Sequence, residues 1–171
     1  MRCFWRLAFF GRPSSIHRAA ALLLAAASAV APLQPVLASD AVKTRTIERP
    51  FADARTDLQT AIVNQGLTVD FNGHVGEMLK RTAADVGAGK TLYSNAEYFT
   101  FCSSRLSRKM MEADLANAGL CPYVMFVFEA ADKPGHVTMG YRLLPAGEGP
   151  SQKPLADINA LLEKILAEAT E

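Results

Sequence analysis

The chain has 171 residues, of which half are apolar and a fifth are charged, and its formal net charge is +1. This length suits one domain, since single hydrophobic cores stop growing only beyond about 250 residues. The apolar share excludes a disordered chain, and three cysteines are too few for a disulfide-rich scaffold. The near-balanced charge excludes an acidic or basic tail protein. Composition alone names no function.

The first 38 residues have the pattern of a secretory signal peptide. Residues 1–18 carry four arginines and no acidic residue, and residues 19–30 form an almost unbroken apolar run. The run is shorter than the ~20 residues that a membrane-spanning helix needs. Val-Leu-Ala at residues 36–38 is typical of a cleavage site, so we place cleavage after Ala38. The sequence therefore predicts an exported, periplasmic protein without residues 1–38.

Removal of this segment changes the charge and the cysteine content. It takes away four arginines and no acid, which leaves 14 Lys and Arg against 17 Asp and Glu, a formal charge of −3. A surface of that sign gives no reason to expect nucleic acid as a partner, and we expect no stable membrane insertion. Cys3 also leaves, so Cys102 and Cys121 remain in an oxidising compartment.

The first half of the mature chain predicts two strands and two helices. Residues 41–48 alternate and are rich in β-branched side chains, which favours a strand. A helix follows, with Asp53 as its expected N-cap and Gly66 after its end, and residues 67–71 resemble a second strand. A second helix of about three turns has apolar positions at helical spacing: Val75, Met78, Leu79, Thr82, Ala83 and Val86.

The second half begins with a strand over residues 97–101 and a helix that runs to about Asn117, with Ser103 or Ser104 as its N-cap. Its inward positions are Leu106, Met110, Ala113 and either Met111 or Leu115. Residues 123–128 are continuously apolar, as expected of a central strand buried on both faces. A turn at residues 133–136 leads into a hairpin partner over residues 137–143. The terminal helix carries an apolar stripe: Leu155, Ile158, Leu162, Ile165 and Ala169.

This order of elements predicts an α+β fold with a single sheet of about four to five strands and helices packed on it. Residues 39–144 form the expected α+β domain. Residues 145–171 form a Gly- and Pro-containing loop and an extra C-terminal amphipathic helix.

Three features of this chain resemble the family named domain of unknown function 302 (DUF 302), over roughly residues 42–143. An aromatic residue opens a helix that ends at a glycine, here Phe51 to Gly66. A strand ends in a cysteine that directly precedes a helix, here at Cys102, and a proline-led apolar strand closes in aromatic-glutamate, here Pro122 to Glu129. The resemblance implies a small α+β fold, often a homodimer, and brings no activity with it.

The chain departs from the commonest pattern of this family at two places. Cys102-Ser103-Ser104 stands where the family has Cys-Asn-Pro, and Leu120-Cys121-Pro122 stands where it has Leu-Pro-Cys. Tyr123 therefore occupies the position of the family's second cysteine. These differences indicate a subgroup with Phe/Leu-Cys-Pro-Tyr.

Cys102 is the strongest candidate for chemistry. It lies just before a predicted helix, where backbone N–H groups and the helix dipole favour a thiolate. Arg105, close by in sequence, could lower the thiol pKa or receive an anionic ligand, or it could belong to a solvated helix face. The alternative for Cys102 is a packing cysteine or a disulfide partner. We take Cys102, Cys121, Tyr123 and Arg105 as the candidate site.

A disulfide between Cys102 and Cys121 is possible but disfavoured by the geometry that we expect. The helix between them spans roughly 20 Å, whereas bridged Cα atoms lie within about 7 Å. With parallel strands joined by this helix, the two cysteines would lie at opposite ends of the sheet. A bond between two copies of the chain also stays open.

No complete catalytic or metal-binding motif is present in the sequence. His74 and His136, with the cysteines and methionines, lack metal-ligand spacing, so we expect no metal and no cofactor. The leading hypothesis is an exported small binding or accessory protein, with an unidentified small ligand or protein partner. The alternative is a thiol-dependent redox or sulfur-handling protein that uses Cys102. An enzyme is the less favoured interpretation.

Overall fold

The computed structural model describes residues 41–171, so the predicted signal peptide lies outside the described residues. The strands are β1 (Val42–Glu48), β2 (Phe71–Gly73), β3 (Tyr93–Phe101), β4 (Tyr123–Ala130) and β5 (His136–Arg142). The helices are α1 (Phe51–Asn64), α2 (Val75–Thr82), α3 (Ser104–Ala113) and α4 (Gln152–Ala169), with short 3-10 helices η2 (Leu115–Leu120) and η3 (Gly149–Ser151). These elements confirm the predicted α+β class.

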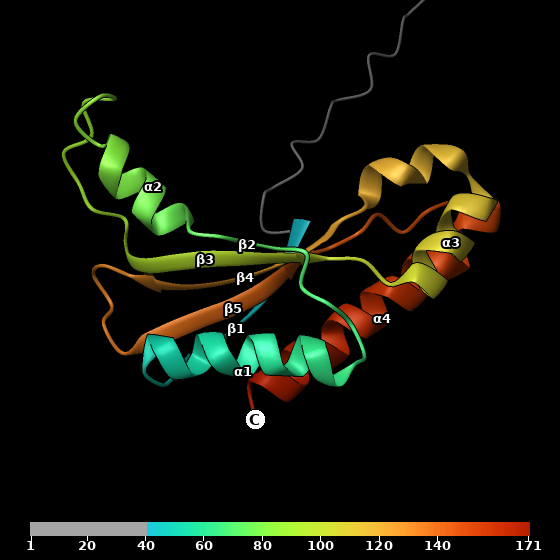
Figure 1. Ribbon diagram of the computed structural model, residues 1–171, viewed down its shortest axis with the longest axis horizontal. Helices are drawn as coiled ribbons and strands as arrows, with labels where there is room; N and C mark the ends of the chain where they lie inside the picture. The colour runs from blue at the N-terminus through green and yellow to red at the C-terminus, as the bar shows by residue number, and fades with distance from the viewer. Residues whose placement is uncertain (1–40) are drawn as a thin grey trace, which may run out of the picture. The chain divides into compact units, whose positions relative to one another are not determined.

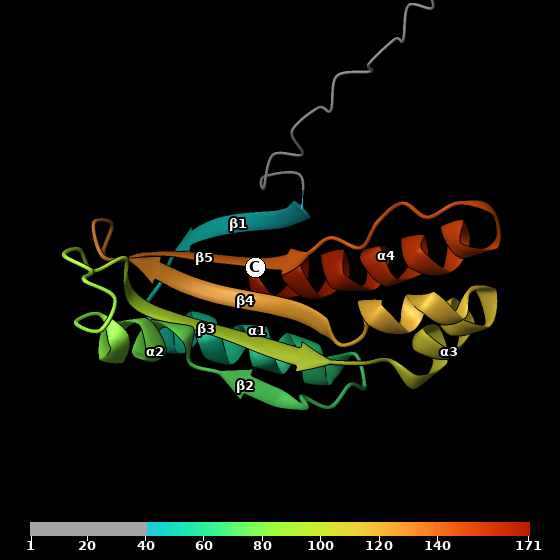
Figure 2. The ribbon, with the colours of Figure 1, turned by 90° about the horizontal axis from the view of Figure 1, so that it is seen from above.

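The five strands form one sheet in the order β1-β5-β4-β3-β2, and every neighbouring pair is antiparallel (Figure 2). The prediction of parallel strands around the third helix is therefore wrong. The chain leaves β3 at Phe101 and re-enters the sheet opposite it, at Tyr123. Between these points α3 and η2 lie beyond the end of the sheet (Figure 1). The chain runs outward along α3 and returns along η2, so both strands meet at the same end.

Helices α1 and α4 cover one face of the sheet, and α2 lies on the other side (Figure 1). Because side chains alternate along a strand, the odd-numbered residues of β3, β4 and β5 point to the α1–α4 face. They form the core with the inner residues of the two helices. The largest fully buried members are Tyr123, Phe99, Phe101, Leu58, Ile62, Met110, Met125, Met139, Leu155, Ile158, Leu162 and Ile165.

Several predicted boundaries shift in the structure. Helix α1 begins at Phe51, directly after Pro50, so Asp53 lies in the first turn and is not the N-cap. The second strand is β2, later than the predicted 67–71, while Leu67 and Val69 pack against the core from the preceding loop. The first shift follows from the backbone, because the Pro50 carbonyl accepts hydrogen bonds from the N–H groups of Asp53 and Ala54, so the first helical turn closes before Asp53 could cap it.

The second and third helices are shorter than predicted. Helix α2 ends at Thr82, and turns take its place up to Gly87. Helix α3 begins after Ser103, whose hydroxyl accepts a hydrogen bond from the Leu106 N–H, which confirms the predicted N-cap. It ends at Ala113, and Leu115 is 83% exposed, so this leucine does not face inward.

Within residues 41–171, no helix combines the length and the apolar character needed to cross a bilayer.

Candidate functional site

Cys102 and Cys121 form a disulfide within the chain, with their Cα atoms 6.4 Å apart. The geometric argument against this bond is wrong because it assumed parallel strands. Cys102 directly follows β3 and Cys121 lies two residues before β4, and these antiparallel strands end side by side. In this state neither sulfur is a thiol, so Cys102 cannot act as a nucleophile without prior reduction.

Of the two other candidate residues, Tyr123 lies near the disulfide and Arg105 does not. Tyr123 is fully buried, and its hydroxyl lies 2.8 Å from that of Ser107, which itself lies 3.8 Å from the Cys121 sulfur. Burial raises the pKa of Tyr123 and outweighs the Ser107 hydrogen bond, which lowers it. Arg105 is exposed on α3 and lines a separate hollow of about 380 Å³ with Lys164 of α4. The structure thus joins Cys102, Cys121 and Tyr123 but does not bring Arg105 to the sulfur atoms.

A second candidate site lies on the sheet face opposite α1 and α4. The even-numbered residues of β3 and β4 point to this face, and no helix of residues 41–171 covers its centre (Figure 1). Tyr98 pairs with Phe126 across the two strands, and the Phe126 and Phe128 rings stack with centroids 6.3 Å apart. Tyr93 meets Phe128 edge to face at 5.3 Å. These rings form an aromatic floor, which we name the open face.

Two of these rings lie directly against glycines of the neighbouring strands. A Cβ on Gly140 would lie 2.7 Å from the Phe126 ring, so that ring rests directly on the β5 backbone. The Tyr98 ring covers Gly73 of β2 in the same way. Phe71, at the edge, lies 6.0 Å from Tyr98 and is 56% exposed. The open face is therefore apolar, wide and only half-buried.

Helix α2 forms a groove with one end of the open face. Gly76 of α2 approaches Ala96 of β3 so closely that a Cβ on Gly76 would lie 2.8 Å from the Ala96 nitrogen. Beside this contact lies a cavity of about 430 Å³. Its lining combines the aromatic floor with apolar residues of α2 and the following loop: Val75, Leu79, Leu92, Tyr93, Ala96, Glu97, Tyr98, Val124, Phe126, Val127 and Phe128. We call this cavity the α2 groove.

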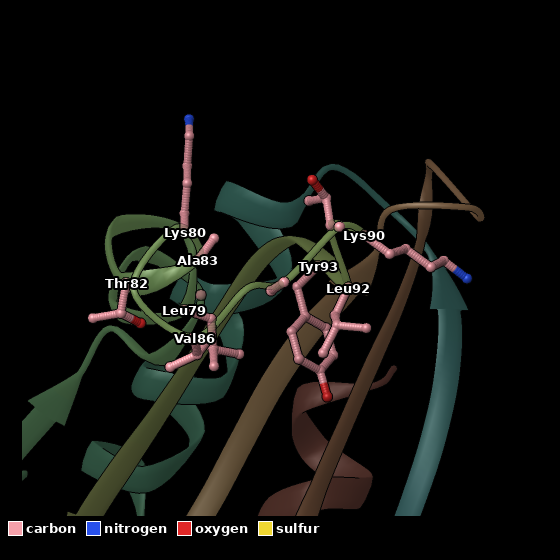
Figure 3. Close-up of a pocket in the computed structure, with 12 residues that line it drawn as sticks. Leu79, Lys80, Thr82, Ala83, Val86, Lys90, Leu92 and Tyr93 are labelled. Carbon is pink, nitrogen blue, oxygen red and sulfur yellow. The ribbon is translucent and has the colours of Figure 1, made fainter.

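A smaller hollow of about 190 Å³ adjoins the α2 groove and shares Leu79, Leu92 and Tyr93 with it. Figure 3 shows Leu79 beside Val86 on one side of this hollow, and Leu92 beside Tyr93 on the other. Lys80 and Lys90 also line the hollow, and both side chains extend outward from it (Figure 3). The apolar groove thus opens at a rim that carries two ammonium groups.

Glu97 is the one carboxylate among the groove-lining residues, and it is bound on the α1 side of the sheet. Its Oε2 accepts hydrogen bonds from Arg55 Nε at 3.2 Å and from Asn72 Nδ2 at 2.8 Å. Its Oε1 lies 3.5 Å from His74 Nδ1. The Arg55 guanidinium also lies 5.2 Å from the Phe99 ring centre. This cluster joins α1 to the sheet and neutralises Glu97.

The described part of the chain has no cluster of side chains that could ligate a metal ion. Residues 41–171 contain no group of three or more His, Cys, Asp or Glu side chains placed to hold an ion. His74 lies beside Glu97. His136 lies at the start of β5, with its Nε2 atom 3.5 Å from Oε1 of Glu48. The two histidines therefore belong to separate polar contacts.

The open face and its groove are absent from the sequence-based candidates. A usable signal exists in the alternation of Tyr98, Phe126 and Phe128 with the core residues between them. We interpreted the apolar run of β4 as buried on both faces, which is wrong for one face. Val124, Phe126 and Phe128 are half-buried there, because α2 reaches only one end of the sheet.

Comparison with known proteins agrees with this fold. The model of the family described as "Domain of unknown function DUF302" matches residues 43–169. Among solved structures, the chain is similar to that of an uncharacterised conserved DUF302 protein from Bacillus stearothermophilus. The TM-score is 0.63 at 15% sequence identity, over 75% of this chain and 98% of that one. No curated protein matches the chain. Since the family model spans most of its length, the chain belongs to the DUF302 family.

Proposed function

We propose that this chain is an exported binding protein whose α2 groove holds a small apolar molecule against the open face. The observation that carries the proposal is the aromatic floor of β3 and β4, left uncovered at its centre and hollowed to about 430 Å³ beneath α2. Small-molecule sites occupy about 300–1,000 Å³ and are lined mainly by apolar and aromatic side chains. Monomeric proteins rarely leave large contiguous apolar patches exposed without a partner for them.

Two features of the lining support a small molecule as the occupant. Leu79 and Leu92 are 37% and 56% exposed although they belong to the groove, so a ligand there would remove apolar surface from water. The Tyr93 and Tyr98 rings offer faces for stacking. Export rests on the leader-like residues 1–38, and the homodimer stays a prediction.

A fluorescence titration with N-phenylnaphthylamine, an uncharged apolar probe, tests the proposal. We expect saturable binding by the exported protein and at least about tenfold weaker binding by Leu79→Ser, because the leucine contributes apolar contact area. Leu115→Ser is the matched control, since Leu115 is exposed on η2 and does not line the groove. Absence of binding, or equal weakening by both substitutions, would overturn the proposal. N-terminal sequencing of the same sample tests export, with Ser39 as the expected first residue.

A second candidate function is thiol–disulfide exchange by Cys102 and Cys121, and two observations favour it. Both cysteines are partly exposed, and Cys102 directly precedes the N-cap of α3. After two-electron reduction of the disulfide to two thiols, the helix N-terminus would stabilise a Cys102 thiolate. Equilibration with glutathione buffers measures the reduction potential. A value near about −200 mV supports exchange, whereas a value below about −300 mV indicates a structural bond.

A further inference from the structure

We infer that the ligand of the α2 groove is an amphiphile with an apolar tail and an anionic head group, of the carboxylate type. The tail lies in the α2 groove, and the head lies at the rim beside Lys80 and Lys90. This inference rests on the proposed function and adds the chemical class of the ligand.

The continuity of the two hollows places the head and the tail. The α2 groove and the smaller hollow share Leu79, Leu92 and Tyr93, so a ligand chain on the aromatic floor can extend past these side chains to the rim. The charged side chains that line the smaller hollow are Lys80 and Lys90. The tail thus meets apolar surface and the head meets positive charge.

Neither lysine is neutralised by the part of the chain that the structure describes. Within residues 41–171, Lys80 and Lys90 form no salt bridge. The groove's own carboxylate, Glu97, is already paired with Arg55 on the opposite side of the sheet. A ligand head would therefore be the counter-charge that the rim lacks.

The segment around the groove carries charge opposite to that of the rest of the protein. Over residues 75–92 the basic side chains Lys80, Arg81 and Lys90 outnumber the acidic Glu77 and Asp85. Residues 41–171 as a whole hold 14 Lys and Arg against 16 Asp and Glu. A local excess of positive charge on an acidic chain favours an anionic ligand at this place.

The outward direction of the lysines fits a head group that stays hydrated. Both ammonium groups extend from the hollow into solvent (Figure 3). A carboxylate at the rim keeps its water and gains attraction that salt screens over about 10 Å. A fully buried charge would need paired hydrogen-bond donors inside the cavity, whereas the α2 groove is lined mainly by apolar and aromatic side chains.

Calorimetric titration of the exported protein with dodecanoate, dodecanol and dodecyltrimethylammonium tests the inference. We expect dodecanoate to bind most tightly at about 50 mM salt and to lose that advantage at about 500 mM. The double substitution Lys80→Gln/Lys90→Gln should weaken dodecanoate binding about tenfold and leave dodecanol within about twofold. Lys109→Gln/Lys164→Gln on α3 and α4 is the charge-matched control and should change neither.

The outcomes separate the two proposals. If dodecanol binds but dodecanoate gains nothing from the lysines, the inference fails and the proposed function stands. Tighter binding of the cationic amphiphile has the same meaning. If none of the three binds, the proposed function fails and the inference fails with it.

Discussion

Phe101 and Tyr123 lie opposite each other at the last pairing of β3 and β4, and their buried rings meet edge to face with centroids 6.0 Å apart. Cys102 follows the first ring directly, and Cys121 precedes the second by two residues. The aromatic pair and the disulfide therefore hold the same end of the sheet, where the chain leaves for α3 and returns from η2.

Loss of the disulfide is expected to destabilise the protein without changing its fold. The bond joins residues 19 apart in sequence, and a loop of that size predicts a loss of about 2–4 kcal/mol. Urea unfolding of Cys102→Ser/Cys121→Ser, compared with the wild type, measures the loss. Wild-type protein held in reductant should match the double variant. Equal stability of the oxidised and reduced wild type would contradict a structural role.

Gly140→Ala is expected to cost at least about 1–3 kcal/mol, because a Cβ at this position would lie 2.3 Å from the backbone carbonyl oxygen of Lys43, 2.7 Å from the Phe126 ring and 2.9 Å from the Thr44 methyl. Thermal unfolding measures the effect. Gly119→Ala is the matched control, since a Cβ there meets nothing within 4 Å. The two variants should differ clearly in melting temperature, and similar values would show that the open face repacks freely.

Glu97→Gln is expected to destabilise the protein by about 1–3 kcal/mol. The glutamate side chain is only 15% exposed, and its loss of charge leaves the Arg55 guanidinium without its partner. Glu112→Gln breaks an exposed pair with Arg108 and should cost no more than about 0.5 kcal/mol. Denaturant unfolding of both variants in the same buffer provides the comparison. A smaller cost at Glu97 than at Glu112 would refute the structural role of the cluster.

Alkaline destabilisation should depend on Tyr141. Burial, together with the hydrogen bond to Glu163 and its charge, raises the pKa of Tyr141 from 10.0 to about 12, although Arg45 lowers it. The folded state holds this proton more tightly, so the stabilisation is complete below about pH 10 and is lost between about pH 10 and 12. Between about pH 10 and 12, the free energy of unfolding of Tyr141→Phe should fall by about 2 kcal/mol less than that of the wild type. If the free energy of unfolding falls with pH equally steeply in both proteins, Tyr141 is not the source of the alkaline destabilisation.

Local signals in the sequence predicted most of the elements. Ser103 caps α3 as expected, because its hydroxyl satisfies an N–H of the first turn. The stripe from Leu155 to Ala169 forms the buried side of α4. Both features depend on neighbouring residues only, so periodicity and side-chain chemistry were sufficient.

The direction and pairing of strands could not be predicted in this way. A helix between two strands usually indicates a parallel crossover, but α3 and η2 fold back on themselves beyond the sheet. That reversal decides whether Cys102 meets Cys121, and it depends on contacts distant in sequence, such as that of Asn117 with Ser151. The groove was missed for the same reason, since α2 contacts the open face only after the sheet has formed.

The disulfide also changes what a broken backbone would mean for this protein. Cys102 and Cys121 flank residues 103–120, which include the exposed η2 with Leu115. A protease that cuts anywhere within this segment would yield two pieces still joined through sulfur, with β3 and β4 side by side. Before reduction the cut protein would stay one molecule, heavier only by the single water consumed, and the fragments would separate once the disulfide is reduced. For residues 103–120, covalent integrity of the molecule thus depends on the redox state more than on the peptide chain.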